Sequence, residues 1–431
     1  MHWTTAAILL GGGLILALSL NLPVAFAFGV LNLIAAWFLF GNVDALSFLV
    51  QSAYSSVANI YLSAVPFFIL MGTIFVRAGL STVVLDSIAK ILHGVRASGA
   101  YVAVFGGIVL GALMGASVAS TAVLGSSLTG ELRRRGYPKS LAVGPIIGSG
   151  TLAGLIPPSI GAVLIGSMAG IPISDLLLAG IGPAIVLSVL LLLYIYWVAR
   201  KYPELDDPGN PVTIRERLRA CLTLVPVLIP IFCVTGVIYL NIATPTEASA
   251  TGALSTFIVA YLYRRMDWKT ILAIATDALE FSAMILFIIV SSKAYSQILA
   301  ITGISSGFAE FLTSVAPSAY VAIVIVLGIA LLLGCFMDQT SVIFVAVPLM
   351  AGAISKLGID PVWFGVMFLM IVGTGGITPP FGLNLFALKA VTPPDITMRD
   401  IYWLCLPFCA LELCTVAITL VFPGIARLLL G

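Results

Sequence analysis

Two pairs of adjacent prolines inside apolar segments constrain the fold of this chain more than any other sequence feature. Pro157-Pro158 and Pro379-Pro380 each follow apolar, glycine-rich sequence. Proline has no N–H to donate and its ring clashes with the preceding turn, so each pair must interrupt a helix. The interruptions belong to a duplicated pattern. Landmarks recur at an interval of about 222 residues: Pro23 with Pro245, Met114 with Met337, and Pro157-Pro158 with Pro379-Pro380.

The composition places these broken helices in a membrane. Of the 431 residues, 61% are hydrophobic and 9% are charged, and the mean hydropathy is +1.17, which excludes a soluble globular protein. Apolar runs of spanning length cover residues 5–20 with 23–40, 181–199, 220–240, 248–263, 281–300, 317–336, 339–355 and 401–422. The first run has no basic region before it, so we do not expect a cleavable signal. The six cysteines have no metal-ligand spacing, and we interpret them as small buried hydrophobes.

The basic residues predict the orientation. They cluster in a few connections, such as Arg133-Arg134-Arg135, Arg200-Lys201 and Arg264-Arg265. By the positive-inside rule these connections are cytoplasmic, and the N-terminus, which lacks flanking positive charge, is periplasmic. The polar, proline-rich stretch 202–213 joins the two halves.

Two segments predict hairpins that enter the membrane and return to the same side. Residues 97–132 are mostly apolar, yet basic clusters at both ends place both ends in the cytoplasm. The middle of this segment is small and rich in hydroxyl groups, which suits a tip that lines a protein cavity inside the membrane. The equivalent segment, 317–356, carries Met-Asp-Gln-Thr-Ser at its tip. Following the topology forward, the second hairpin enters from the opposite side.

We therefore predict an all-α polytopic membrane protein of two inverted-topology repeats, each with a re-entrant helical hairpin and a Pro-Pro-broken transmembrane helix. The first half comprises scaffold helices at 1–80, an interfacial arm at 81–98 and a transport repeat at 99–200 (hairpin 99–135, broken helix 139–170, span 173–200), followed by a cytoplasmic linker at 201–219. The second half comprises scaffold helices at 220–300 with an arm at 267–280, and a transport repeat at 301–431 (hairpin 317–356, broken helix 361–391, span 401–422). The arms mix charged and apolar residues, which suits helices on the membrane surface; ordinary cytoplasmic loops are the alternative.

The proline pairs also free main-chain oxygens. In an uninterrupted helix the N–H groups of residues 157 and 158 would bond the carbonyls of Ala153 and Gly154. Pro379 and Pro380 release the carbonyls of Gly375 and Gly376 in the same way. An unpaired carbonyl in hydrocarbon costs several kcal/mol, roughly, so each needs a partner. Such unwound carbonyls hold sodium in secondary transporters, and a hard cation bound by oxygens is one possible partner. A kink satisfied by nearby hydroxyls is the structural alternative.

Asp338 is the most informative single residue. A carboxylate in so apolar a segment costs about 2.5 kcal/mol or more, so it indicates function by default. It could neutralise a bound cation, carry a proton, or have a purely structural hydrogen-bonding role. Glu247 suits the N-terminus of a helix, with a transport role as the alternative. Lys389 is expected to snorkel, whereas Lys293 could contact a substrate. Asn384 suits either polar recognition or helix packing.

Soluble-enzyme and ATP-driven functions find no support in the sequence. His2 and His93 are the only histidines and neither has a catalytic setting. No Gly-x-x-x-x-Gly-Lys motif is present, so nothing indicates ATP-driven transport. An ion channel would need a ring of charges along a continuous path, which this sequence lacks. We expect neither an enzyme, nor an organic cofactor, nor a nucleic-acid partner.

Four motifs together resemble a known family. Gly154-Leu-Ile-Pro-Pro-Ser159, Ala243-Thr-Pro-Thr-Glu-Ala248, the Gly334–Thr340 segment and Ile377–Phe386 are similar to the large membrane subunit of tripartite ATP-independent periplasmic (TRAP) transporters, of the DctM type. The similarity runs from the helix at Asn21 to the final span. The resemblance implies a sodium-coupled, elevator-type importer in a bacterial inner membrane. It further implies a separate four-helix membrane subunit, and a periplasmic binding protein that delivers an organic acid such as a C4-dicarboxylate, a sugar acid or sialic acid.

The resemblance also implies site residues. The first sodium site maps onto Ser117, Ser120, Ala153, Ile156 and Pro158. The second maps onto Gly334, Asp338, Thr340, Gly375, Thr378 and Phe381. Substrate contacts map onto Ser117, Ser159, Asp338 and Asn384, between the hairpin tips, where helix N-termini offer positive dipole ends. Some family members carry an acid at the first tip, where residues 116–121 here are neutral. A binding-protein-independent sodium/dicarboxylate symporter of related fold is the alternative function.

Overall fold

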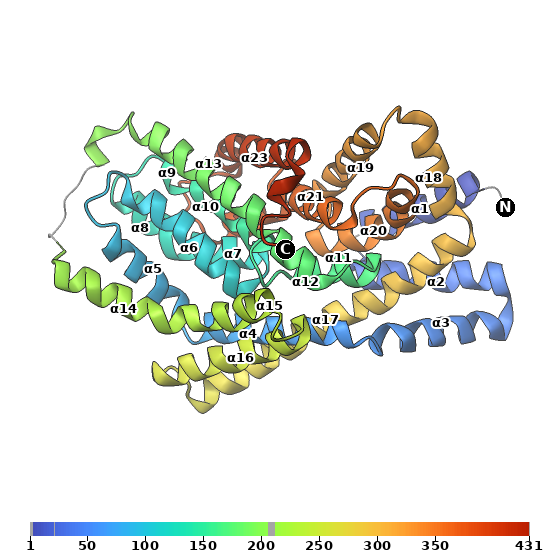
Figure 1. Cartoon of the computed structure of the whole chain (residues 1–431), viewed down its shortest axis with the longest axis horizontal. Coiled ribbons are helices and arrows are strands. Elements are labelled where there is room, and N and C mark those ends of the chain that lie inside the picture. The colour runs from blue at the N-terminus through green and yellow to red at the C-terminus, as the bar shows by residue number, and fades with distance from the viewer. Residues whose placement is uncertain (1–2, 21, 206–211, 431) are drawn as a thin grey trace.

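A computed structural model describes residues 3–20, 22–205 and 212–430 (Figure 1). Every regular element in these ranges is helical. Five helical segments are long and apolar enough to cross a membrane: Ile60–Arg77, Ile173–Ala199, Ile214–Tyr239, Trp268–Ile301 and Met398–Val421. Many large apolar side chains on the outside of the protein, such as Phe38 and Ile214, are exposed, as expected where lipid replaces water around the helices. The chain is therefore an all-helical, multi-pass membrane protein, as the composition predicts.

The first half begins with α1 (Trp3–Ser19), α2 (Val24–Phe40), α3 (Asn42–Val57), η1 (Ile60–Ser63), α4 (Ala64–Arg77) and α5 (Leu80–Ile91). The first hairpin consists of α6 (Ser98–Met114), α7 (Ser117–Leu124), η2 (Gly125–Thr129) and α8 (Gly130–Arg134). The remaining elements are α9 (Lys139–Ala142), α10 (Gly144–Thr151), η3 (Leu152–Gly154), α11 (Ile160–Ala169), α12 (Ile173–Ala179), α13 (Ile181–Ala199) and η4 (Pro203–Leu205).

The second half begins with α14 (Ile214–Ile231), η5 (Phe232–Gly236), α15 (Val237–Tyr239), α16 (Pro245–Leu262), α17 (Trp268–Ile301) and α18 (Ile304–Val315). The second hairpin consists of α19 (Ala319–Gly334) and α20 (Gln339–Lys356). The remaining elements are α21 (Pro361–Gly375), α22 (Leu383–Val391), α23 (Met398–Val421) and η6 (Pro423–Ile425). The segment predicted as an arm at 267–280 is the first part of α17, which continues without a break for 34 residues because no proline or glycine interrupts it.

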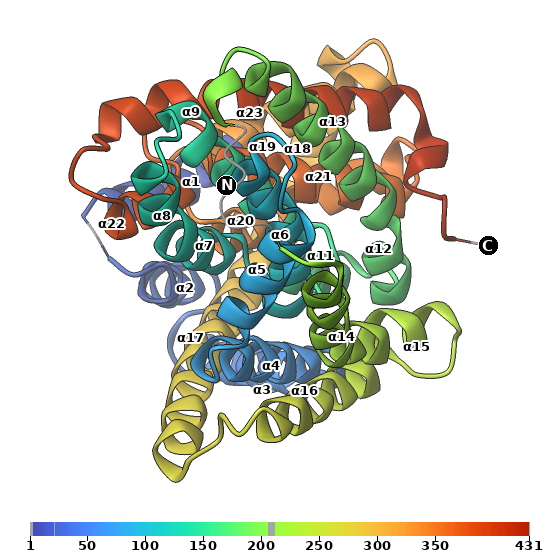
Figure 2. The same cartoon turned by 90° about the vertical axis from the view of Figure 1, so that its left-hand side faces the viewer.

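The helices form two groups. In both views α4, α16 and α17 lie together along the lower side of the molecule, and contacts of α2 and α3 with α17 extend this group (Figures 1 and 2). The hairpin of the first half lies on the left in Figure 1, and that of the second half on the right. The broken helices α10–α11 and α21–α22 each pack on both hairpins. Protein covers the first interruption, whereas Pro380 and Phe381 in the second are exposed.

Corresponding contacts recur in the two halves. Helix α6 packs on α10, and α19 packs on α21. The return helix of each hairpin packs on the broken helix of the other half, α7 on α22 and α20 on α11. In the scaffold, α2 packs on α17 and α4 on α16. These matching contacts agree with the duplicated landmarks, while the inverted orientation of the halves across a membrane stays a prediction.

Small residues permit the closest of these approaches. A Cβ added at Gly375 on α21 would lie 2.6 Å from the Cα of Gly334 on α19. In the first half, a Cβ added at Gly111 would lie 2.9 Å from the Cα of Ala153. Backbones that approach this closely leave no room for a larger side chain, and this mode of packing is common between membrane helices.

Gly375→Ala is expected to destabilise the protein by about 1–3 kcal/mol, because the added methyl must displace a backbone rather than a flexible side chain. The matched control is Gly373→Ala in the same helix, where a Cβ meets no atom within 4 Å. The control should change stability by no more than about 1 kcal/mol, and in the stabilising direction. Thermal unfolding of both variants in detergent is the measurement; equal midpoints would contradict the close-packing argument.

Candidate cation and substrate site

Each hairpin tip is hydrogen-bonded to the broken helix of its own half. The N–H of Ile160 donates to the carbonyl of Gly115 at 3.3 Å, and the N–H of Gly382 donates to the carbonyl of Cys335 at 3.3 Å. Gly115 has a φ of +61° and a Cβ there would lie 2.6 Å from the carbonyl oxygen of Pro158. Both the left-handed backbone and the close approach require glycine at the first tip. The predicted tip and break residues are therefore brought together in both halves.

Both breaks fall at the proline pairs. Helix α10 gives way to the single 3₁₀ turn of η3, and regular helix resumes only at Ile160. Helix α21 ends at Gly375 and α22 begins at Leu383. Both proline pairs, Pro157-Pro158 and Pro379-Pro380, are joined by cis peptide bonds. The predicted interruption is thus present in each half.

Three of the four carbonyls released by the prolines find donors within the breaks. The hydroxyl of Ser159 donates to Gly154 at 2.5 Å, and the N–H groups of Thr378 and Asn384 donate to Gly375 and Gly376 at 3.1 and 3.0 Å. The structural alternative, in which groups near the kink satisfy the released carbonyls, is therefore present for these three, because the loop folds back on itself. A carbonyl oxygen has a second lone pair, so it remains able to bind a cation.

The first predicted cation site contains buried hydroxyls that lack partners. Ser117, Ser120 and Thr121 on α7 are all buried. Within the described part of the chain the hydroxyls of Ser120 and Thr121 have no hydrogen-bond partner, and the same holds for Ser149 on α10. Thr121 packs directly on Gly150 of α10. A buried unsatisfied hydroxyl costs about 1–3 kcal/mol, so these oxygens fit a small hard cation, or water, without any acidic residue at the tip.

Asp338 in the second predicted site is the N-cap of α20. Its carboxylate accepts the N–H of Ser341 at 3.0 Å and also the Ser341 hydroxyl. The structural role considered for this residue is therefore present. Its negative charge remains available at the tip, since no ion pair of Asp338 is found among the described residues.

The other residues predicted for the second site differ in their accessibility. The hydroxyl of Thr378 donates to the carbonyl of Thr374 at 2.7 Å. Thr340 is half-buried. Phe381 is exposed, with its ring 5.7 Å from Phe336 at the tip. Asn384 is buried, and its side-chain Nδ2 has no partner in the described part of the chain. Among the predicted substrate contacts, Asn384 therefore has a donor to offer, whereas the hydroxyl of Ser159 caps α11.

The two hairpin tips contact each other through Gln339. The sequence placed this residue at the second tip but indicated no role for it. The hydroxyl of Ser117 donates to Gln339 Oε1 at 3.2 Å. These residues are 222 positions apart, the interval of the duplication. The amide of Gln339 also lies beside Gly154 and Gly161 of the first broken helix. The position predicted for a substrate carboxylate is therefore lined by one side chain from each tip.

Sequence reasoning also missed Glu412. This acid lies in the middle of α23, where its carboxyl is a hydrogen-bond partner of Thr151 from the first broken helix. The signal that singled out Asp338, an acid inside an apolar span, applies equally to Glu412. Elsewhere, Glu247 forms a capping box with Thr244 at the start of α16, as its helix-terminal interpretation predicts. Lys389 donates to the carbonyl of Ile396 at 2.6 Å, and Lys293 lies half-buried on α17.

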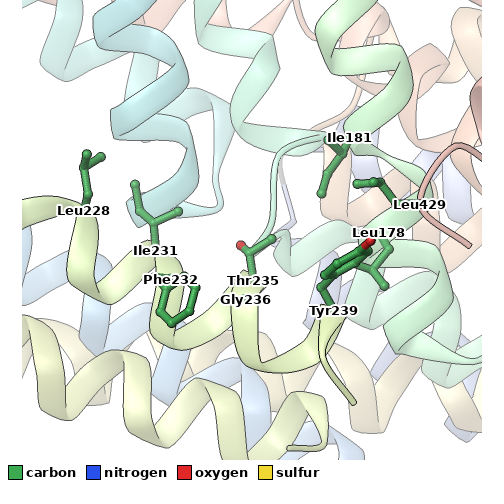
Figure 3. A pocket seen from close by; sticks show the side chains of 9 residues that line it. All are labelled: Leu178, Ile181, Leu228, Ile231, Phe232, Thr235, Gly236, Tyr239 and Leu429. Atoms are coloured by element: carbon green, nitrogen blue, oxygen red, sulfur yellow. The ribbon is translucent and has the colours of Figure 1, made fainter. Parts of the chain in front are cut away.

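A separate groove on the outside of the protein contains none of the predicted site residues. It has a volume of about 370 Å³ and lies between the α12–α13 region and α14–α15 (Figure 3). Its lining is almost entirely apolar: Leu178, Ile181, Leu228, Ile231, Phe232, Thr235, Gly236, Tyr239 and Leu429. This lining suits hydrocarbon and offers little to an organic acid.

Comparison with known proteins places this chain in a family. Residues 12–425 match the family described as "Tripartite ATP-independent periplasmic transporter, DctM component". The chain is 30% identical to the C4-dicarboxylate TRAP transporter large permease protein DctM of Pseudomonas aeruginosa, over 83% of this chain and 84% of that protein. It is 27% identical to the 2,3-diketo-L-gulonate TRAP transporter large permease protein YiaN of Escherichia coli, over 92% and 93% of the two chains.

A solved structure shares the fold. The YdaH transporter of Alcanivorax borkumensis superposes with a TM-score of 0.64 at 15% identity, covering 90% of each chain. Identity at this level supports the fold alone. The arrangement of helices described above therefore also occurs in a solved membrane transporter.

We expect the contact between Ser117 and Gln339 to be measurable as a coupling energy. Thermal unfolding of Ser117→Ala, Gln339→Ala and the double variant should give a non-additive term of about 0.5–1.5 kcal/mol, the usual net value of one hydrogen bond. Ser126→Ala is the matched control on the same hairpin, because the Ser126 hydroxyl bonds Val123 of its own segment. Paired with Gln339→Ala it should be additive. Additivity in both cycles would show that the tips do not interact.

Proposed function

Since this chain belongs to the DctM component family of tripartite ATP-independent periplasmic transporters, we propose that it imports an organic acid, coupled to sodium entry. It is a transporter and not an enzyme, because its relatives are named permeases. The substrate we propose is a carboxylate such as a C4-dicarboxylate or a sugar acid, including sialic acid. The proposed location is a bacterial inner membrane, with the N-terminus in the periplasm.

The observation that most supports this proposal is the meeting of both tips and the first break around Ser117 and Gln339. Neutral donors and helix N-termini gather at this point. Such groups attract a carboxylate without the desolvation cost of a buried lysine or arginine. Asn384, with its unpaired donor, is the proposed specificity residue of the second half.

The proposed sodium sites lie where each tip contacts its break. Ser117, Ser120, Ala153, Ile156 and Pro158 form the first, in which only neutral oxygens act. The second uses Gly334, Asp338, Thr340, Gly375, Thr378 and Phe381, with the charge of Asp338 balancing the cation. Sodium supplies positive charge that orders both tips. The residues themselves close the tips onto the breaks through the hydrogen bonds at Gly115 and Cys335.

The proposed cycle moves the hairpins and broken helices as one body against the scaffold, as in an elevator. In support of this, α7–α22 and α20–α11 interlock the two transport repeats, whereas α4–α16 and α2–α17 hold the scaffold. Three further components complete the proposed system: the lipid bilayer, a small four-helix TRAP membrane subunit, and a periplasmic substrate-binding protein.

Asp338→Asn should raise the sodium concentration for half-maximal uptake by about tenfold, equivalent to about 1.4 kcal/mol of lost binding. Asparagine caps helices as well as aspartate does, so the fold is retained and the variant reports on charge alone. Asp267→Asn, at the N-cap of α17, is the matched control and should leave sodium activation unchanged. Uptake by reconstituted vesicles over a sodium series is the measurement. Equal activation in all three proteins would remove Asp338 from the site.

The alternative is a symporter that works without a binding protein. Vesicles containing this chain and the small subunit separate the two functions when uptake is measured with and without the purified periplasmic protein. The proposed function requires uptake only when the binding protein is added, and only with a sodium gradient. Equal uptake in its absence would favour the binding-protein-independent symporter.

A further inference from the structure

Glu412 is the one acidic or basic side chain among the described residues that is fully buried, with 3% of its surface exposed. It lies at the junction of three elements. The hydroxyl of Thr151, at the end of α10, donates to its carboxyl, and the hydroxyl of Thr374 on α21 lies within reach of the same carboxyl. One side chain on α23 therefore joins the first broken helix to the second. None of the proposed sodium or substrate contacts includes it.

Among the described residues, no positively charged side chain forms an ion pair that could balance a carboxylate at Glu412. Helices α10 and α21, which pack on α23, carry no titratable side chain. Most titratable groups on α23 and its other neighbours have partners elsewhere: Lys139 pairs with Asp400, Lys389 bonds Ile396, Cys409 bonds Ile377, Cys405 bonds Tyr402, Tyr402 bonds Pro380, and Tyr194 packs edge-on against Phe408. Arg399, Cys414 and Tyr196 are exposed. In the described ranges no ion pair involves Glu412. An ionised carboxylate is costly in such a place.

The hydrogen bonds of the Thr151 and Thr374 hydroxyls also favour a neutral carboxyl at Glu412. Thr151 has one hydroxyl proton, and the carbonyl of Gly148 lies 2.8 Å from its oxygen. Thr374 also has one, and the carbonyl of Met370 lies 2.9 Å away. This bonding to the preceding turn is usual for threonine inside a helix. The Thr151 hydroxyl also donates to Glu412 Oε1, whereas the single proton of the Thr374 hydroxyl serves Met370. The Thr374 oxygen therefore faces the carboxyl with lone pairs only, and one donor is missing on that side.

We propose that Glu412 is a protonation site whose neutral carboxyl supplies the missing proton and so clasps both broken helices to α23. Glu412 is a positioning residue: it holds the helix ends that precede Ala153 and Gly375. Loss of the proton places an unbalanced charge between these ends and loosens them. The effect on transport rests on the proposed function, whereas the protonation itself does not.

Infrared spectroscopy of the purified protein tests the protonation directly. The wild type should show the C=O stretch of a protonated carboxyl at neutral pH, and Glu412→Gln should lose that band. Asp400→Asn, which removes an ion-paired acid from the start of the same helix, should retain it. A neutral-pH spectrum in which Glu412→Gln removes no such band would overturn the proposal, whether or not the protein transports any acid.

Uptake measured against pH tests the role. Glu412→Gln keeps the size and neutrality of the protonated acid, so uptake at neutral pH should stay within about twofold of wild type. At alkaline pH wild-type uptake should fall while that of Glu412→Gln stays level. Glu412→Leu, which cannot hydrogen-bond, should lose about tenfold or more, the effect of one buried hydrogen bond of ordinary strength. Loss of uptake in Glu412→Gln at every pH would show that the negative charge is needed, which contradicts a neutral clasp.

A second variant covers the case in which Glu412→Leu fails to fold. Thr151→Val with Thr374→Val retains the carboxyl and removes both of its partners. The infrared band of the protonated carboxyl should then move to higher frequency, because the hydrogen bonds that lower it are gone. An unshifted band in a folded double variant would contradict the clasp.

Discussion

The close contact between each hairpin tip and the interrupted helix behind it is the constraint on which the rest of this structure depends. At the first tip the backbone turns through the left-handed region at Gly115 and passes the carbonyl of Pro158 at a distance that admits only glycine. At the second, Gly334 and Gly375 bring two helices together at the level of their backbones. Non-helical backbone inside a membrane is tolerated only when protein surrounds it. These contacts cover the first break, whereas Pro380 and Phe381 in the second are exposed.

Hydrogen bonding inside an apolar interior explains much of the remaining detail. Ser159, Thr378 and Asn384 satisfy carbonyls that the prolines leave without helical partners. Among the described residues, Ser120, Thr121, Ser149 and Asn384 carry buried groups without partners on the tips and breaks, and Asn32, Ser52 and Gln297 carry others in the scaffold helices. Buried polar groups without partners are rare in folded proteins, so those on the tips and breaks support a site that binds something from outside the chain.

The sequence could predict the tips and the breaks because their chemistry is local. A proline pair stops a helix wherever it occurs, and an apolar hairpin with basic ends has few ways to lie in a membrane. The same local reasoning placed an acid at the second tip, although the structure adds that Asp338 caps its own helix. It left open whether a cation or nearby groups would satisfy the released carbonyls, because the donors reach them only after the chain folds back. Gln339 was missed for a related reason, because its partner, Ser117, lies 222 residues away. Glu412 carries the same local signal as Asp338, and only its partner, Thr151, 261 residues away, lay beyond local reasoning.

By itself, the sequence determined the class of the protein, the number of its interrupted helices and the duplication that relates them. These properties follow from the length of the apolar segments, the chemistry of proline and the interval between repeated landmarks. All three can be determined from the order of residues alone. Only the tertiary structure decided which tip meets which break, that each return helix packs on the opposite half, and that one buried acid spans both interruptions. Such contacts join residues far apart in the chain, and a local pattern cannot state which distant partner will satisfy a given hydrogen-bonding group.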